Sequence, residues 1–246
     1  MPMDHERVAA LLSAPRLTSY RQNTTTLTEA VELYEWDLRA ASRVLVLTGL
    51  VEVIVRNAID RELAGWASRR SDSSEWFDHV PLDAQGAADL AKARLRATQR
   101  GRRPEVHGRV VAELTFGFWR YLVESRYHTA LWVPGVHRAF PDGAPNLRVR
   151  RAEVAQRLQQ LHFVRNRAAH YEPIHERDLG RDQRLAVELL SWVSPVAGAW
   201  AERVSDLPAV IAARPRSPHL RCTRATPHPE TARHRARKVV SWTHDQ

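Results

Sequence analysis

Apolar residues along this chain recur mostly at intervals of three and four positions, and the alternation typical of strands hardly appears. Thr26 and Glu29 have the spacing of a capping box, in which each side chain accepts a hydrogen bond from the other residue's backbone amide. The pair predicts the start of a helix, which continues through a series of inward-facing positions at Ala30, Tyr34, Leu38 and Ala41.

The next apolar segment, 51–55, is rich in β-branched residues and admits a strand as an alternative. However, Thr48, Glu52, Arg56 and Asp60 form a polar row at four-residue spacing. Only a helix lines up residues with this spacing on one face. We therefore predict a helix here as well.

The remaining pattern predicts further helices separated by polar, Pro- and Gly-containing loops. The expected helical segments are 87–99, 106–114, a helix that follows Thr115 and reaches Leu131, the longest clear helix over 147–169, and a final helix over 178–204 with a kink at Pro195. The expected organisation is one all-α domain over 1–213 and a disordered tail over 214–246, where apolar periodicity is lost.

The formal net charge of +9 is mostly a property of the tail. From Arg214 onward there are eight Arg and Lys against two acids, which leaves +6 in the tail and +3 in the rest. A basic tail is compatible with a polyanionic partner or with simple solvation. The single cysteine, Cys222, excludes an internal disulfide and a cysteine-rich zinc site, and no apolar run is long enough to span a membrane. We expect a cytoplasmic protein without membrane association.

The stretch LHFVRNRAAHYEPIH, 161–175, concentrates polar chemistry at a helix end. Val154, Leu158, Leu161 and Ala168 have the spacing of a core-facing stripe, and Arg165 is predicted to fall on the same stripe. A guanidinium is expensive to bury unless a carboxylate or a ligand meets it.

Helix geometry puts Asn166 about 40° from His170 and Arg165 about 140° from it, while Pro173 predicts a helix end near Tyr171. An imidazole, a fixed cation and an amide suit phosphoryl chemistry without a metal, with His170 as general acid or base and Arg165 stabilising developing charge. RNA supplies its own nucleophile, the 2′-hydroxyl.

The spacing of Arg165 and His170 carries little weight by itself. Arg followed five positions later by His also occurs at 102/107, 157/162 and 214/219. The long helix, the intervening Asn166 and the helix stop distinguish the pair at 165/170.

Three segments taken together resemble the Abi-like branch of the HEPN superfamily, helical proteins of phage abortive infection and toxin–antitoxin systems. They are VEVIVRNAID at 51–60, VAELTFGFW at 111–119 and RNRAAHYEPI at 165–174. The resemblance covers roughly 16–204. It implies a helical-bundle ribonuclease that needs no metal or other cofactor and forms a homodimer with two motifs facing a shared cleft.

Under this resemblance Arg165 and His170 match the catalytic pair, and Asn166 matches the polar residue that follows the Arg. Many relatives have a second His where this chain has Tyr171, and a phenol is a poor proton shuttle at neutral pH. The residues predicted to line the site, or to brace its helix, are Glu52, Arg56, Asn57, Arg167, Tyr171, Glu172 and His175. The aromatic cluster Phe116, Phe118 and Trp119 is expected in the core.

The resulting hypothesis is a metal-independent endoribonuclease of phage defence or a toxin–antitoxin system, with an RNA substrate and a protein or RNA antitoxin. The alternative is a non-catalytic HEPN protein that binds RNA or acts as a scaffold, which Tyr171 favours. A third hypothesis, a DNA-binding regulator, depends on the basic tail and lacks a clear recognition helix.

Overall fold

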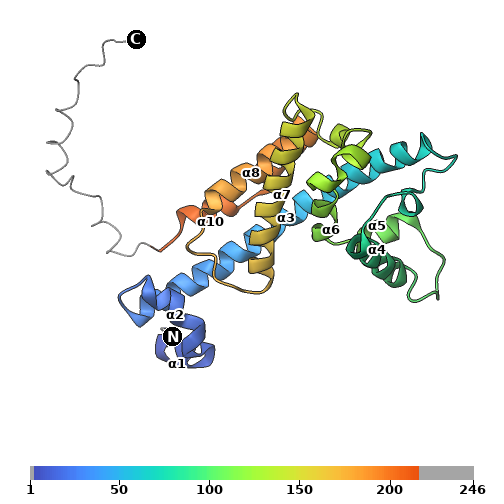
Figure 1. Cartoon of the computed structure of the whole chain (residues 1–246). Coiled ribbons are helices and arrows are strands. Elements are labelled where there is room, and N and C mark those ends of the chain that lie inside the picture. Colours follow the sequence, from blue (N-terminus) through green and yellow to red (C-terminus); the bar gives the residue numbers. More distant parts are fainter. Residues whose placement is uncertain (1–2, 216–246) are drawn as a thin grey trace, which may run out of the picture.

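The computed structural model describes residues 3–215. Within that range helices are joined by turns and loops, which confirms the predicted all-α class. Helix α3, Leu27–Ser68, runs the length of the molecule, and later helices pack along it (Figure 1). The predicted tail lies outside the described residues from position 216 onward.

Helix α3 contains both segments for which the sequence predicted helix. The capping box is present: Thr26 Oγ1 accepts from the Glu29 amide at 3.1 Å, and the Glu29 carboxylate accepts from the Thr26 amide at 3.4 Å. Val51 and Val55 are fully buried, whereas Val53 between them is 43% exposed. In a strand, residues 51, 53 and 55 would all face the same side of the sheet. Burial of residues four apart, with an exposed residue between them, is the pattern of a helix. At 42 residues α3 is longer than the 23-residue helix over 147–169, so the prediction that the latter is the longest was wrong.

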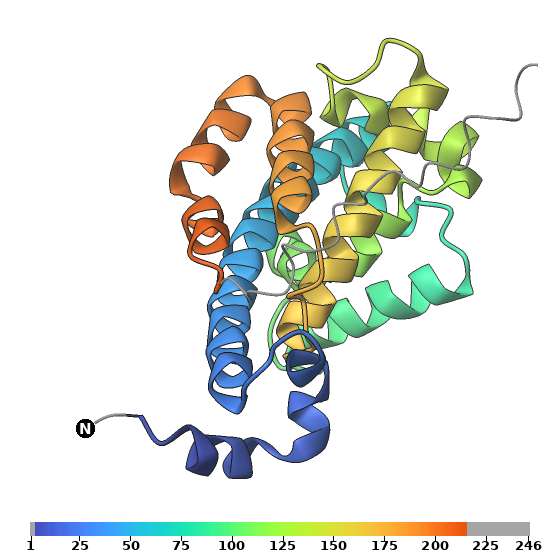
Figure 2. The ribbon, with the colours of Figure 1, turned by 90° about the vertical axis from the view of Figure 1, so that its left-hand side faces the viewer.

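Most of the other elements pack against α3, whereas α4 and α5 pack mainly on each other, and α4 also contacts α6 (Figures 1 and 2). Helix α7 has the predicted bounds, and α4 and α5 begin and end within three residues of theirs. The elements are α1 His5–Leu12, α2 Ala14–Gln22, η1 Trp76–Asp78, α4 Ala84–Ala97, α5 His107–Glu113, α6 Phe116–Tyr121, η2 Ser125–Tyr127, η3 His128–Trp132, η4 Val136–Ala139, α7 Leu147–Ala169, α8 Leu179–Val193, α9 Pro195–Val204 and α10 Leu207–Ala212.

The helix predicted to reach Leu131 ends at Tyr121 instead. Asp83 is the reason: its carboxylate accepts from the Tyr121 hydroxyl and from Arg126 at 2.6 Å, and its amide donates to the Tyr127 hydroxyl at 3.3 Å. A continuous helix would turn Tyr121 and Arg126 about 140° apart. The chain must therefore leave the helix to bring both to one carboxylate.

Pro195 separates two helices and does not merely kink one. Ser194 is extended, with φ −167° and ψ 133°, as expected for a residue before proline, and Pro195 starts α9 where no amide hydrogen is needed. The α9 helix then packs against α8 so closely that a Cβ on Gly198 would lie 1.9 Å from Ser191 Oγ. A side chain at 198 would displace the Ser191 hydroxyl and crowd Ser191 Cβ and Cα, at 3.0 Å and 3.1 Å, so this position favours glycine.

One apolar core extends from Leu17 to Leu207. Trp76, Trp119 and Trp132 are fully buried in it. Phe116 and Phe118 are buried beside Trp119, which confirms the core role predicted for this aromatic cluster.

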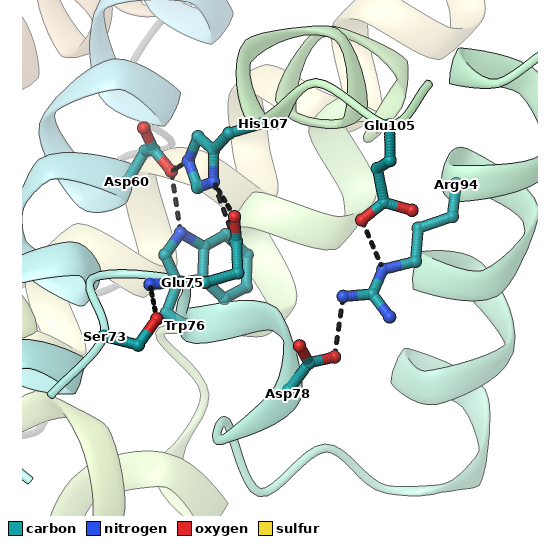
Figure 3. A network of polar contacts seen from close by, with 8 residues as sticks. All are labelled: Asp60, Ser73, Glu75, Trp76, Asp78, Arg94, Glu105 and His107. Atoms are coloured by element: carbon teal, nitrogen blue, oxygen red, sulfur yellow. Dashed lines mark hydrogen bonds and ion pairs between the residues drawn. The ribbon is translucent and has the colours of Figure 1, made fainter. Parts of the chain in front are cut away.

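A polar network joins α5 to α3 and to the loop between α3 and α4 (Figure 3). His107 contacts Glu75 through Nδ1 and Asp60 through Nε2, both at 2.8 Å, and Asp60 also accepts from Trp76 Nε1 at 2.7 Å. Only the imidazolium form can donate from both ring nitrogens. Burial lowers the pKa of His107, but the hydrogen bonds to Asp60 and Glu75 outweigh it, so that the pKa is raised above its usual value.

This network predicts a pH-dependent contribution to stability. A raised pKa in the folded state means that the contribution of His107 is complete below about pH 6.5 and is lost as pH rises through the folded pKa. Relative to His107→Gln, the wild type should therefore lose urea resistance as pH rises above about 6.5 and through the raised folded pKa. Equal changes of the urea midpoint in both proteins would show that His107 does not carry the charge.

Candidate active site

Helix α7 ends where the sequence predicted, and its last residues present His170 to solvent. The amide of Tyr171 donates to Ala168 O at 3.2 Å, and the amide of Glu172 donates to Arg167 O at 2.8 Å. This is the pattern of a Schellman cap, with Tyr171 in the left-handed region at φ 55°. That conformation costs a non-glycine residue about 1–2 kcal/mol. His170 is the C-cap residue, and its side chain is exposed.

The last three turns of α7 form one wall of a hollow of about 380 Å³, here called the α7 groove. Its lining residues are Arg120, Gln159, His162, Phe163, Asn166, Arg167, His170 and Glu172. The groove thus unites four of the residues predicted from the sequence, namely Asn166, Arg167, His170 and Glu172. Helix α6 contributes Arg120, whose Nη1 donates to Glu124 at 3.1 Å.

Arg165 is partly buried and is not among the residues that line the α7 groove. The buried stripe of α7 runs through Val154, Leu158, Leu161, Val164 and Ala168, so Arg165 is at its edge and not on it as predicted. Its Nη1 donates to Asn166 Oδ1 at 3.2 Å.

Glu52 on α3 is the carboxylate that faces Arg165. Burial raises the pKa of Glu52, while Arg165, Arg56 and the backbone amide of Phe116 oppose the shift. Glu52 on α3 therefore lies near Arg165 of α7 and near the start of α6. Of the two roles considered for the row on α3, this placement matches bracing of the α7 helix. Asn57 is exposed and lies about 140° around α3 from Glu52, so it does not join this cluster.

His162 is a groove residue that the sequence analysis did not select. Asn166 Nδ2 lies 3.3 Å from His162 Nε2. Because Arg165 can only donate, the oxygen of the Asn166 amide must face it, which turns the NH₂ group toward His162. His162 Nε2 then accepts, which requires the neutral ring. Burial lowers the pKa of His162, and Arg120 and Arg165 lower it further. The four-residue spacing of His162, Asn166 and His170 is the sequence signal that could have identified His162 as a groove residue.

His175 does not reach the α7 groove. Its ring is fully buried, 4.7 Å from the ring of Tyr20, with Nε2 3.3 Å from Ser19 Oγ. Arg167 holds the intervening turn, since its Nη2 donates to Pro173 O at 2.7 Å and its Nη1 lies 3.5 Å from Glu172. Tyr171 is 63% exposed, and its carbonyl accepts from Arg16.

A buried carboxylate anchors this turn to α3. Asp37, 4% exposed, accepts from the Tyr20 hydroxyl at 2.7 Å and from the Ile174 amide at 3.1 Å. Burial raises the pKa of Asp37, and the two hydrogen bonds oppose the shift. The segment that follows His170 is thereby held against helices α2 and α3.

Within residues 3–215 no cluster of three or more His, Cys, Asp or Glu side chains is arranged to hold a metal ion. None of the helices in that range combines the length and apolar character required to cross a membrane. The sequence matches no family model, and no curated protein or solved structure is significantly similar to it. The Abi-like resemblance therefore stays a prediction.

Proposed function

We propose that the protein is a metal-independent endoribonuclease that cuts RNA by 2′-hydroxyl attack, in phage defence or a toxin–antitoxin system. The observation that carries the proposal is the pair of imidazoles in the α7 groove, one exposed at His170 and one neutral at His162, beside the cation of Arg120. The biological setting rests on the sequence resemblance alone.

The proposed chemistry needs one proton acceptor and one proton donor. The 2′-hydroxyl gives its proton to a neutral imidazole and attacks the adjacent phosphorus, and the 5′-oxygen leaves with a proton from the second imidazole, which acts as the imidazolium. The products are a 2′,3′-cyclic phosphate and a 5′-hydroxyl. Arg120 supplies positive charge in the α7 groove, and Arg165, which donates to Asn166 of the lining, adds positive charge from outside it. Within residues 3–215, His170 forms no side-chain hydrogen bond or ion pair that would compete with this role.

The direct test is incubation of the purified protein with total RNA in the presence of a chelator, followed by mapping of the cut ends. We expect 2′,3′-cyclic phosphate and 5′-hydroxyl ends, and no cleavage of DNA of the same sequence. Ends with a 3′-hydroxyl and a 5′-phosphate, or cleavage that stops on chelation, would contradict the proposal.

A second candidate function is RNA binding without cleavage. Two observations favour it: Arg167 is engaged with Pro173 and Glu172, and Tyr171 stands where many Abi-like relatives have a histidine. Such a protein would bind RNA with an affinity that falls as salt rises, but would never produce cyclic-phosphate ends.

The proposal includes a homodimer, for which α3 offers a surface. Leu45, Val46 and Val53 are exposed on the side of α3 opposite the core, and a Cβ on Gly49 between them would meet nothing within 4 Å. An apolar stripe with a glycine at its centre lets a second helix approach closely. A partner copy there would lie next to Glu52 and hence near the α7 groove.

We expect Val53→Glu to convert a dimer into a monomer, because it would bury a charge at the contact. Sedimentation equilibrium of both proteins measures this. The matched control is Val149→Glu, an equally exposed valine on α7. A monomeric wild type, or a dimer that survives Val53→Glu, would refute this surface.

A further inference from the structure

A second hollow adjoins the α7 groove on the other side of Phe163 and Arg167. It has a volume of about 360 Å³, here called the loop hollow, and is lined by Ser19, Phe163, Arg167, Pro173, Ile174, His175, Glu176 and Arg177. The volume is near the lower end of the range of about 300–1,000 Å³ typical of small-ligand sites. The two hollows share Phe163 and Arg167, so they lie next to each other.

Phe163 is the apolar surface common to both hollows. It is 50% exposed although it is one of the largest side chains of α7. The guanidinium carbons of Arg177 and Arg167 lie 5.3 Å and 5.8 Å from the centre of its ring. An open aromatic ring flanked by guanidinium groups is a surface on which planar ligands stack.

Both arginines are held in place before any ligand binds. Arg177 Nη2 donates to Asp182 at 2.8 Å and to Gln160 at 3.2 Å, while Arg167 donates to Pro173 O. The walls of the loop hollow are thus preorganised, so that binding there orders few side chains.

Polar side chains also line the hollow. His175 is completely buried, and within the described residues its Nδ1 has no hydrogen-bond partner, while its Nε2 lies 3.3 Å from Ser19 Oγ. At the rim, the Glu176 carboxylate accepts from Asn23. The buried His175 ring is closed to a ligand, whereas the exposed Glu176 carboxylate suits one with a donor along its edge.

We propose that the loop hollow binds one unpaired nucleobase of the RNA, stacked on Phe163, next to the phosphate in the α7 groove. This inference rests on the proposed function, and it assigns the substrate class as single-stranded RNA with an exposed base beside the cut. Unpaired bases are the usual targets of RNA-binding sites, because only they can stack on aromatic and Arg surfaces. The adjoining groove supplies the cations for the backbone, as single-strand binding requires.

The experiment measures binding of a short single-stranded RNA to the His170→Ala protein, so that cleavage does not interfere. A fluorescent 2-aminopurine is placed at successive positions. At one position we expect quenching by stacking, which Phe163→Leu removes and Phe163→Tyr retains. Phe163→Leu should weaken binding roughly 5- to 150-fold. The matched control, Trp200→Leu, removes an exposed aromatic ring from α9 and should change neither quantity.

An abasic nucleotide at the quenched position provides the decisive comparison. The abasic change should weaken binding to the Phe163 protein and add nothing once Phe163→Leu is present, because both remove the same contact. Fully additive losses, or quenching that survives Phe163→Leu, would overturn the nucleobase site. A protein that stacks the base but never cuts RNA would lose the proposed function and keep this site, whereas one that cuts RNA without stacking would show the reverse.

Discussion

Replacement of His170 by alanine is expected to abolish RNA cleavage and leave the fold intact. The imidazole is exposed at the C-cap of α7 and lines the α7 groove, so its removal breaks no packing that stabilises the protein. Loss of one general acid or base lowers the rate by about 10²- to 10⁴-fold. The initial rate of cleavage of a labelled RNA measures the effect, and the helical circular dichroism should stay unchanged.

The control for His170 is His79→Ala, which removes an exposed imidazole from the loop before α4 and should cleave like the wild type. His162→Ala provides the second comparison, because it removes the neutral imidazole bonded to Asn166. Cleavage by His170→Ala at the wild-type rate would contradict the assignment. If only His162→Ala lost activity, the catalytic role would belong to His162 alone.

Replacement of Asp37 by alanine is expected to give a large loss of stability. The change leaves the Tyr20 hydroxyl and the Ile174 amide buried without their acceptor. Each unsatisfied buried group costs about 1–3 kcal/mol, so the free energy of unfolding should fall by roughly 2–6 kcal/mol. Urea denaturation followed by circular dichroism measures the change.

Two variants calibrate this result. Tyr20→Phe removes one donor and leaves the Ile174 contact, so it should cost about 1 kcal/mol. Asp72→Ala removes an exposed carboxylate and should change the free energy of unfolding by less than about 0.5 kcal/mol. A loss for Asp37→Ala no larger than that for Asp72→Ala would show that the buried carboxylate does not anchor the turn after α7.

The features predicted correctly from the sequence depend on neighbours in the chain. The capping box at Thr26 and Glu29 begins α3, and Asn146 before α7 and Pro173 after it limit that helix. The four-residue polar row was sufficient to choose helix over strand at 51–55. Such signals act over one or two turns, where spacing alone decides which groups meet.

The features that were not predicted depend instead on contacts between residues far apart in the sequence. The early end of α6 depends on Asp83, 38 residues before Tyr121, and the burial of His175 depends on its contacts with Tyr20 and Ser19. His162 was not selected from the sequence, yet its contact with Asn166 and the position of α6 make it part of the groove. The proximity of Arg165 to Glu52 likewise involves two helices that are more than 100 residues apart in the sequence.

The sequence by itself determined the helical class, the start of α3, the bounds of α7 and the concentration of Asn166, Arg167 and His170 at one helix end. Only the tertiary structure decided that Arg167 is engaged with the turn after α7, that the His162 imidazole is neutral and that His175 is buried. The physical reason is that helix formation follows from local spacing, whereas burial, charge state and hydrogen-bond partners depend on which distant segments pack together.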